Sequence, residues 1–579
     1  MELSTLEKMI AVASGLKPAD LVIKNCQIVD VFNQQIISGD LAITAGKIVG
    51  VGEKYSGIEE YDAKGKYVTP AFIEGHIHIE SSYLSPEEFG RVVVPLGTGT
   101  VIADPHEIAN VCGVQGVTYM LEAARHTVLD VQLMLPSCVP ATCFEHNGAV
   151  LSAQEIETLL KREGVLGLGE MMNYPGVTKG DSEVLHKILA ALKQGKVVDG
   201  HAPFLTGKAL NAYVTAGIHT DHECSTIAEM QERLRLGMYV QLRNGAACKN
   251  LVPLLAGVTT ANFRRCLLCS DDIHPQNILQ QGHINADVMT CIKEGIPPLQ
   301  AITMATLNGA ECYGLQDRGA LAPSRRADIC LWESLEDLTC PEMVWLEGVA
   351  VAEKGKYLPQ VLPADITPVT NTMVVKDYSQ EKLKLSLKTT QVRTIDIIPG
   401  EIITEQGQAE ILLDAQGDFS YNPQEDLVKV AVIERHKGVG TVGLGLLRNF
   451  GLKRGAIAVT VAHDSHNIIV AGTNNSDMDA AVQRIIAMQG GIVLVLEGNS
   501  LAEMPLPIAG LMSNKRAEEV ARTLADIHAK AHAVLGISKQ VDPLMTLSFM
   551  ALPVIPHLKL TDEGLFDVDK FSLVTLEIK

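Results

Sequence analysis

Eight short apolar runs recur between residues 71 and 272, and they constrain the fold more than any other feature. Each run is apolar over its whole length, as expected for strands buried on both faces of a parallel sheet. Stretches with helical spacing separate several of them. Eight strand–helix units in about 250 residues predict a (β/α)8 TIM-type barrel, with a doubly wound open sheet as the alternative. The runs are 71–79, 98–105, 131–139, 164–172, 196–202, 217–223, 239–245 and 265–272.

The segments on both sides of this region have a different pattern. Residues 1–68 and 318–370 alternate apolar and polar residues between turn-forming ones, which is typical of short antiparallel strands. We therefore expect the two flanks to form one small β-sandwich domain into which the barrel, residues 69–317, is inserted. After a link rich in Pro and Thr, residues 375–579 mix strand and helix patterns and predict a carboxyl-terminal α+β domain.

The bulk composition narrows the class of partner. With 68 acidic against 48 basic residues, the formal net charge of −20 argues against binding to nucleic acid. No apolar stretch reaches the ~18 residues of a membrane span, and no secretory signal opens the chain. The 12 cysteines are scattered and mostly lie in apolar runs, as reduced thiols do in the cytoplasm. We expect a cytoplasmic protein that binds a small molecule, without membrane or nucleic acid, as a homodimer or higher homo-oligomer.

Polar residues close five of the predicted strands, which is where catalytic groups of a barrel lie. A single residue of this kind is usually a buried polar side chain whose hydrogen bonds are all made within the protein. Six of them at the same end of five strands predict a metal site instead. The first two share a side of the strand because residues i and i+2 point the same way. The six are His76, His78, Glu170, His201, His222 and Asp271.

Four imidazoles and two carboxylates suit two divalent ions that share a bridging ligand. The mixed nitrogen and oxygen set favours Mn, Fe or Zn over Ca or Mg. Such ions can lower the pKa of water from ~15.7 to about 7 and so supply a hydroxide nucleophile. A carboxylate beside it, here Asp271, can accept the proton of the water and pass it to a leaving group.

Several stretches of the chain resemble the amidohydrolase superfamily and, within it, the adenine deaminase family with an additional carboxyl-terminal domain. They include "GHIHIESS", "DPHEIANV", "GEMMNYPGV", "CSDD", "TVAHDSHNI" and "LPVIPHLKLTDEGLFD". The resemblance implies a metal-dependent aminohydrolase that converts adenine to hypoxanthine and ammonia by means of a metal-bridging hydroxide. It implies two divalent ions, Mn²⁺ first, with Fe²⁺ or Zn²⁺ as alternatives.

The same resemblance assigns the ligands. His76 and His78 would bind the first ion together with Asp271, whereas His201 and His222 would bind the second. Glu170 would bridge the two ions. Cyclic-amide hydrolases of this superfamily have a carboxylated lysine on strand four, and residues 164–172 contain no lysine. This difference argues against a hydantoinase- or dihydroorotase-like hydrolase, which stays the first alternative because its layout is otherwise similar. The second is a non-catalytic protein that binds a metal or a purine.

The loop after the second strand adds Asp104, His106 and Glu107 to the same face of the barrel. Asp104 could instead be the N-cap of a helix, but we also weigh it as a substrate-binding or supporting residue. We assign His106 and Glu107 to substrate binding or to protonation of a ring nitrogen.

Three further polar features have less certain roles. Glu80 follows His78 on the same face and is expected to support a ligand histidine. Asp272 could exchange roles with Asp271. The "HDSHN" stretch, residues 463–467, could be a second metal cluster, a group that closes over the barrel mouth, or a structural turn.

Overall fold

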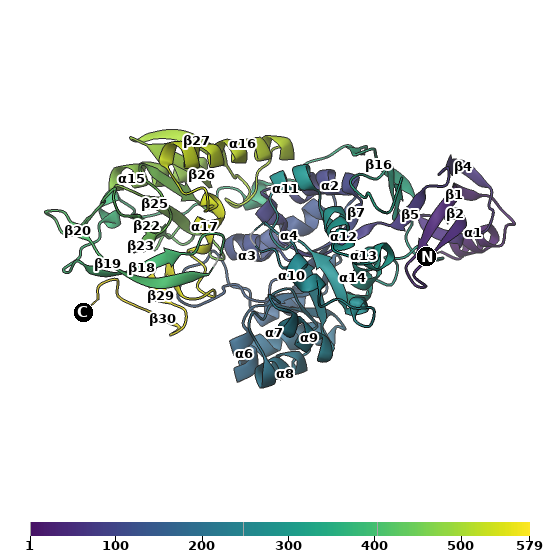
Figure 1. Ribbon diagram of the computed structural model, residues 1–579, viewed down its shortest axis with the longest axis horizontal. Helices are drawn as coiled ribbons and strands as arrows, with labels where there is room; N and C mark the ends of the chain where they lie inside the picture. Colours follow the sequence, from purple (N-terminus) through teal and green to yellow (C-terminus); the bar gives the residue numbers. More distant parts are fainter. Residues whose placement is uncertain (1, 247, 402, 579) are drawn as a thin grey trace.

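The structure is a computed structural model that describes residues 2–246, 248–401 and 403–578. Three parts follow one another along its longest axis (Figure 1). The amino-terminal sheet lies at one end, the barrel lies in the middle, and the carboxyl-terminal domain lies at the other end. The barrel therefore contacts both of the other parts.

All eight predicted strands are present in two parallel sheets, which confirms the predicted α/β class. Five strands form one sheet in the order β10-β9-β8-β7-β6, and three form another in the order β11-β12-β13. A bridge between Ile77 and Asp271 joins β13 to β6, and the N–H of His219 donates to the carbonyl of Val198 at the β10–β11 junction. The strands are β6 (Phe72–Ile77), β7 (Thr98–Ala103), β8 (Asp130–Leu135), β9 (Val165–Met171), β10 (Val197–Gly200), β11 (Thr220–Asp221), β12 (Tyr239–Arg243) and β13 (Cys266–Cys269).

Most of these strands end before the predicted runs do. Of the six residues predicted to bind metal, His76 and Glu170 lie within their strands, whereas the other four lie just beyond a strand end. β10, for example, ends at Gly200 immediately before His201, and β13 ends two residues before Asp271.

Helices cover the outside of the barrel, as their amphipathic patterns predict. Their starts are capped by local chemistry: the Asp181 carboxylate accepts the N–H groups of Glu183 and Val184 at the start of α7, and Ser152 and Glu155 form a capping box on α5. The helices of this region are α2 (Pro86–Val93), α3 (His106–Cys112), α4 (Val114–Ala124), α5 (Ala153–Leu159), α6 (Tyr174–Lys179), α7 (Ser182–Lys193), α8 (Gly207–Thr215), α9 (Ile227–Arg235), α10 (Leu251–Leu255), α11 (Pro275–Gln281), α12 (Ile284–Lys293), α13 (Pro298–Met304) and α14 (Leu307–Cys312).

Strands from both flanks of the barrel share one nine-stranded sheet. β5 links the two flanks because it pairs with β1 on one side and with β14 on the other. Side chains from both flanks, including Ile28, Leu41, Ile329 and Trp345, pack into one apolar cluster. The elements are α1 (Leu3–Ala13), β1 (Ala19–Asp30), β2 (Gln35–Thr44), β3 (Lys47–Val51), β4 (Gly57–Asp62), β5 (Tyr67–Pro70), β14 (Ile329–Trp332), β15 (Met343–Leu346), β16 (Val349–Glu353) and β17 (Lys356–Tyr357).

The carboxyl-terminal part is built on an eight-stranded sheet in the order β19-β18-β23-β22-β25-β24-β26-β27. A separate small sheet, β28-β29-β30, follows α17. The main elements are β18 (Gln391–Ile397), β19 (Thr404–Glu410), β22 (Leu427–Ile433), β23 (Val442–Arg448), β24 (Ala456–Val459), β25 (Ile468–Gly472), α15 (Asn475–Met488), β26 (Gly491–Leu496), β27 (Asn499–Pro505), α16 (Ala517–Lys530), α17 (Pro543–Phe549), β28 (Leu558–Thr561), β29 (Gly564–Asp567) and β30 (Ser572–Leu573).

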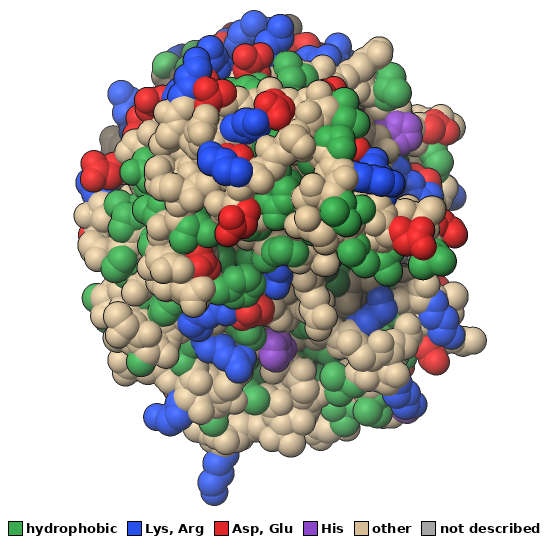
Figure 2. Space-filling view, turned by 90° about the vertical axis from the view of Figure 1, so that its right-hand side faces the viewer, with side chains coloured by type: hydrophobic (Ala, Val, Ile, Leu, Met, Phe, Trp, Pro, Cys, Tyr) green, Lys and Arg blue, Asp and Glu red, His purple; other side chains and the backbone are tan. Residues whose placement is uncertain are grey.

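The surface gives little sign of a large specialised patch at the end that carries the nine-stranded sheet. Acidic and basic side chains are interspersed there, with hydrophobic groups between them (Figure 2). Among the described residues, no helix is both long and apolar enough to cross a bilayer.

Candidate active site

The six residues predicted to bind metal come together at the carboxyl ends of the barrel strands. Their ligand atoms form overlapping groups within 4.8 Å, among them His76–His78–Glu170 and Glu170–His201–His222. Five of the six side chains are buried and His201 is partly buried. They arrive from β6, β9, β10, β11 and β13, so the barrel topology alone brings residues 76 to 271 to one place.

Glu170, on β9, lies at the centre of this cluster. Its Oε1 is 3.3 Å from Nε2 of His78. Its Oε2 is 2.7 Å from Nδ1 of His201 and 3.2 Å from Nε2 of His222. The two carboxylate oxygens thus face different histidines, which is the arrangement that a bridging ligand needs.

Asp271 faces the histidines of β6. Its Oδ1 is 3.0 Å from Nε2 of His78 and 3.7 Å from Nε2 of His76. Backbone hydrogen bonds fix this approach, because the N–H of Asp271 donates to the carbonyl of His76 and the N–H of His78 donates to the carbonyl of Asp271. The other oxygen, Oδ2, accepts a hydrogen bond of 2.6 Å from Nη1 of Arg243.

The polar atoms of the cluster fit divalent ions. Both ring nitrogens of His76 and Nδ1 of His222 are buried without a hydrogen-bond partner among the described residues, which is costly in an ion-free core. His78 donates Nδ1–H to the carbonyl of Asp104 at 2.9 Å, and this leaves the lone pair of Nε2 directed toward the cluster. Four imidazoles with two carboxylates are ligands that Mn, Fe and Zn accept.

Both carboxylates of the cluster are ionised. Burial by itself would raise the pKa of Asp271, but Arg243 and the neighbouring histidines hold that pKa well below its usual range. Burial likewise opposes ionisation of Glu170, whereas His201, His106 and His222 hold its pKa well below the usual range. Negative charge is therefore concentrated where the imidazole nitrogens converge, which favours a bound cation.

A cavity of about 360 Å³ opens onto the cluster, a size typical of small-molecule sites. The barrel contributes five of the six predicted ligand residues, all but His76, and, from its loops, Met172 and Phe204. The opposite wall belongs to the carboxyl-terminal domain, which contributes His463, Phe549 and Leu552 among others. The site is thus formed between two parts of the chain.

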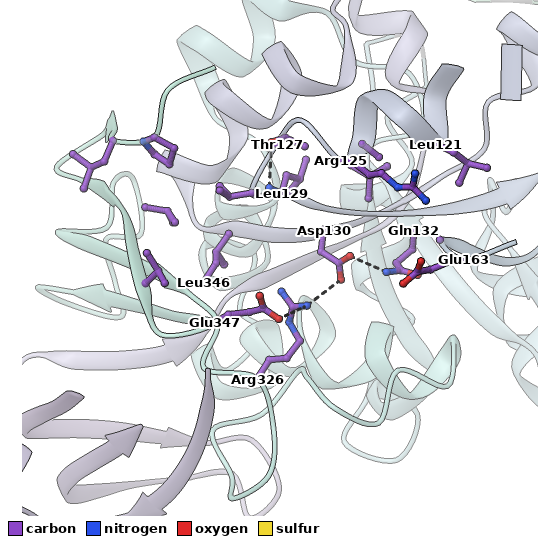
Figure 3. A pocket seen from close by; sticks show the side chains of 18 of the residues that line it. Leu121, Arg125, Thr127, Leu129, Asp130, Gln132, Glu163, Arg326, Leu346 and Glu347 are labelled. Carbon is purple, nitrogen blue, oxygen red and sulfur yellow. Dashed lines mark hydrogen bonds and ion pairs between the residues drawn. The ribbon is translucent and has the colours of Figure 1, made fainter. Parts of the chain in front are cut away.

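A larger hollow, about 850 Å³, lies on the other side of the barrel near the amino end of β8. Asp130, Arg326 and Glu347, three of its charged residues, already contact one another (Figure 3). Asp130 accepts a hydrogen bond of 2.8 Å from the Gln132 amide, and Arg326 lies 3.2 Å from Glu347. This hollow combines paired charges with apolar side chains and is remote from the strand-end cluster, so we place no chemistry there.

The three predicted residues of the loop after β7 all lie at the cavity or directly beneath it. Asp104 does not cap α3: the N-cap is Pro105 and no side-chain cap is formed. Its Oδ2 accepts the N–H of Glu170 at 3.0 Å instead. Nδ1 of His106 is 3.3 Å from Oε1 of Glu170, and its Nε2 is 3.5 Å from Oε1 of Glu107.

Glu80 and Asp272 differ in how closely they approach the cluster. The hydrogen bond expected from a ligand histidine to Glu80 does not occur among the described residues. Oε1 of Glu80 accepts the N–H of Ile108 at 3.2 Å, in the first turn of α3, and burial raises the pKa of Glu80 to about 7. Asp272 accepts a hydrogen bond from the Ser81 hydroxyl, and its ligand atom lies within 4.8 Å of those of His78 and Asp271.

Sequence reasoning missed Arg243 and Glu223. Arg243 ends β12, where its Nη1 contacts both Asp271 and Oε1 of Glu223 at 2.6 and 2.5 Å. Glu223 Oε1 is also 3.4 Å from Nε2 of His222. The sequence pattern could have indicated Arg243, because it lies near the end of the seventh apolar run, as the six predicted residues do in theirs.

The "HDSHN" stretch lies in the loop between β24 and β25 and reaches the barrel mouth. Nδ1 of His463 is 2.7 Å from Oε1 of Glu107, and Nε2 of His466 is hydrogen-bonded to Oε2 of the same carboxylate. Oδ1 of Asp464 lies 3.9 Å from Nε2 of His106. Of the three interpretations left open by the sequence, the position agrees with a group that closes over the barrel.

The chain is similar to known amidohydrolases and adenine deaminases over almost its whole length. Residues 67–351 match the amidohydrolase family, and residues 401–572 match the adenine deaminase C-terminal domain. The chain is 53% identical to adenine deaminase 2 of Desulfotalea psychrophila over 577 residues, 100% of each chain. It is 49% identical to adenine deaminase of Ligilactobacillus salivarius, again over 100% of each chain. Adenine deaminase of Clostridium acetobutylicum is 50% identical over 98% of this chain and 100% of the relative.

Proposed function

This chain belongs to the adenine deaminase family of the amidohydrolase superfamily, and on that premise we propose that it hydrolyses adenine to hypoxanthine and ammonia. The similarity extends over the full length and includes both the barrel and the carboxyl-terminal domain. The structural observation that carries the proposal is the convergence of four histidines and two carboxylates in one cluster that a cavity opens onto.

The residues of the cluster would hold two divalent ions. His76, His78 and Asp271 would bind one, His201 and His222 would bind the other, and Glu170 would bind both. When bound, such ions activate a water molecule as a nucleophile at neutral pH. Mn²⁺ suits the mixed nitrogen and oxygen ligands, with Fe²⁺ and Zn²⁺ as alternatives.

We assign the proton transfer to Asp271. Its Oδ2 is held by Arg243 at 2.6 Å, so the carboxylate cannot rotate freely and Oδ1 stays directed toward the histidines of β6. The pKa of Asp271 is low enough to keep the group ionised. We infer from its position beside the metal-binding histidines that it accepts a proton from the attacking water and delivers it to the amino group that leaves from C6.

We assign the opposite, ring-nitrogen side of the reaction to the loop after β7. His106 lies between Glu170 and Glu107, so it is placed to pass a proton between the cluster and the cavity. Addition of water at C6 raises the electron density on the adjacent ring nitrogen, and a proton donor there stabilises the transition state. Glu107 is fixed by two histidine hydrogen bonds and positions His106.

Purified protein loaded with Mn²⁺ tests the activity directly. We expect one ammonia and one hypoxanthine for each adenine consumed. Hydantoin and dihydroorotate serve as the comparison substrates, because a cyclic-amide hydrolase would act on them. Turnover of either in preference to adenine would refute the assignment, and so would a complete lack of adenine turnover by the metal-loaded protein.

Metal analysis of the purified protein tests the cluster independently of activity. We expect about two divalent ions per chain by elemental analysis, since the cluster offers two ligand groups that share one carboxylate. Removal by a chelator should abolish ammonia release, and addition of Mn²⁺ should restore it. Protein that has been incubated with Mn²⁺ and still contains no divalent metal would contradict the ligand assignment.

A further inference from the structure

A buried cluster of Glu107, His463 and His466 joins the barrel to the carboxyl-terminal domain beside the cavity. Glu107 belongs to α3 of the barrel, whereas both histidines belong to the loop between β24 and β25. One oxygen of Glu107 is bonded to each imidazole. All three residues are at most 5% exposed, so the protonation of each side chain depends on its hydrogen bonds.

His466 is a neutral structural residue. The N–H of Ala462 donates to its Nδ1 at 3.2 Å, so Nδ1 carries no proton and Nε2 must be the N–H that donates to Glu107. Burial lowers the pKa of His466 to about 4, in agreement with a neutral ring. Both of its nitrogens are thus used within the protein.

His463 is bound on one side only. It donates Nδ1–H to Oε1 of Glu107 at 2.7 Å, and its ring stacks on Phe549 with centroids 4.6 Å apart. Its Nε2 has no hydrogen-bond partner among the described residues, and the side chain lines the cavity. Burial opposes protonation of this ring, but Glu107 raises the pKa of His463 to about 9.

The hydrogen bonds argue against a third metal ion at this cluster. The three ligand atoms do lie within 4.8 Å of one another. However, the two nitrogens that face Glu107 both donate protons to it, so neither offers a lone pair. The ionised carboxylate balances the charge of His463, and the cluster is complete without a cation.

The surroundings of His463 suit a flat heteroaromatic ring. Phe549 and Leu552 lie on the same wall of the cavity, and Met172 and Phe204 come from the barrel loops. Adenine has apolar faces and ring nitrogens that accept hydrogen bonds in its plane. An imidazole that presents N–H at the edge of such a slot matches one of those nitrogens.

We propose that His463, positioned by Glu107, binds adenine through a hydrogen bond from its Nε2 to a ring nitrogen, so that the carboxyl-terminal domain supplies part of the substrate-binding site. This inference rests on the proposed function. It explains why Glu107 of the barrel is shared by two histidines of a separate domain. It assigns recognition to His463 and leaves the metal ligands entirely to the barrel.

Two variants of His463 separate recognition from structure. Asparagine keeps a donor near the position of Nδ1, so His463→Asn retains the contact with Glu107 and removes the Nε2 group. Glutamine reaches the position of Nε2, so His463→Gln retains the donor in the cavity and loses the contact with Glu107. His532→Gln is the matched control, because this histidine of the same domain bonds to the carbonyl of Ile537 and does not line the cavity.

Loss of one hydrogen bond from a charged donor should raise the KM for adenine about 10- to 100-fold in His463→Asn, with an unchanged metal content. His463→Gln should fall between that variant and the wild type, and His532→Gln should match the wild type. A purely structural role predicts the reverse order, with asparagine better tolerated than glutamine. That order would overturn the proposal.

Dissociation constants of 1-, 3- and 7-deazaadenine, measured by calorimetry, identify the bonded nitrogen. The wild type should bind one of the three at least tenfold more weakly than adenine, and His463→Asn should reduce that ratio to about twofold. Unchanged ratios for all three analogues would refute the hydrogen bond. If the asparagine variant does not fold, His463→Phe replaces it, because it keeps the stacked ring without nitrogens. Absence of adenine turnover by the wild type would refute the proposed function alone, since the binding ratios still decide the role of His463.

Discussion

Arg233 is expected to hold the second histidine pair in place, although it touches neither histidine. It belongs to α9 and is completely buried. Its Nε donates to Oδ2 of Asp221 at 2.8 Å, and its Nη2 donates to the carbonyl of Ala202 at 2.7 Å. Asp221 precedes His222 and Ala202 follows His201, so one guanidinium ties together the two segments that carry these ligands.

The structure sets the size of the effect of Arg233→Met. The change removes a fork of two hydrogen bonds and leaves the Asp221 carboxylate, also 0% exposed, without its cation. Removal of one partner from a buried ion pair costs about 3–5 kcal/mol of the free energy of unfolding. Loss of a group that orients metal ligands typically lowers metal affinity about 10- to 100-fold.

Three measurements follow from this reasoning. Urea denaturation should show the loss of stability, elemental analysis after dialysis should show about one ion per chain instead of about two, and ammonia release should fall accordingly. Arg235→Met is the control. Arg235 lies on the same helix, but its side chain is 72% exposed and forms a surface ion pair with Glu232 at 3.6 Å. Surface pairs of this kind contribute less than about 1 kcal/mol.

An Arg233→Met protein that loses less than about 1 kcal/mol of unfolding free energy and keeps both ions would show that Arg233 does not hold the second histidine pair in place. Lower stability with a full complement of ions would separate the two effects: the buried ion pair would matter for folding, whereas the positions of His201 and His222 would depend on other contacts. Arg233→Lys keeps the charge without the fork and should give an intermediate loss.

Three other predictions concern the site and the carboxyl-terminal domain. Asp271→Asn should lower kcat for adenine about 10²- to 10⁴-fold by removing the proton acceptor; a rate of ammonia release within tenfold of the wild type would contradict that role. Glu170→Gln should reduce the bound ions from about two per chain to fewer than one, because a neutral amide cannot bridge two cations as a carboxylate does. Elemental analysis measures this number, and a result of two ions per chain would count against a bridging role. Burial and the nearby Arg435 hold the pKa of His436 well below its usual range. Below a pH of about 6.5, His436 is therefore protonated in the unfolded chain but still neutral in the folded protein. The free energy of unfolding should therefore be greatest above that pH and fall by up to about 1.4 kcal/mol per pH unit below it. Urea denaturation at several pH values should show that this free energy depends less steeply on pH in His436→Gln. An equal dependence in both proteins would mean that other groups cause the acid sensitivity.

The sequence predicted the barrel and the strand-end cluster for the same physical reason. Parallel strands buried on both faces produce continuous apolar runs, and barrel closure places all their carboxyl ends at one edge. A polar residue that ends such a run, such as Glu170 or His201, is therefore easy to recognise, and its place at the barrel mouth can be predicted. Arg243 obeys the same rule but was overlooked, since an arginine is not a usual metal ligand.

Other assignments needed coordinates because they depend on which partner a side chain meets. Asp104 has the right type and position for an N-cap, but its carboxylate accepts the N–H of Glu170. Glu80 follows the ligand histidines at the spacing of the same face, yet the chain turns there into a short 3-10 helix, Ile79–Ser82. The period-of-two rule no longer applies beyond His78, and Glu80 reaches Ile108 instead.

Local periodicity and a closed topology are enough to predict the barrel and the six metal-binding candidates at its mouth, because both follow from the apolar runs and the polar residues that end them. What covers that mouth depends on long-range contacts that no local pattern encodes. His463 and Glu107 are 356 residues apart, and no periodic pattern relates them. Their contact depends on how two separately folded surfaces pack together, which is fixed by the shape and charge of many side chains at once.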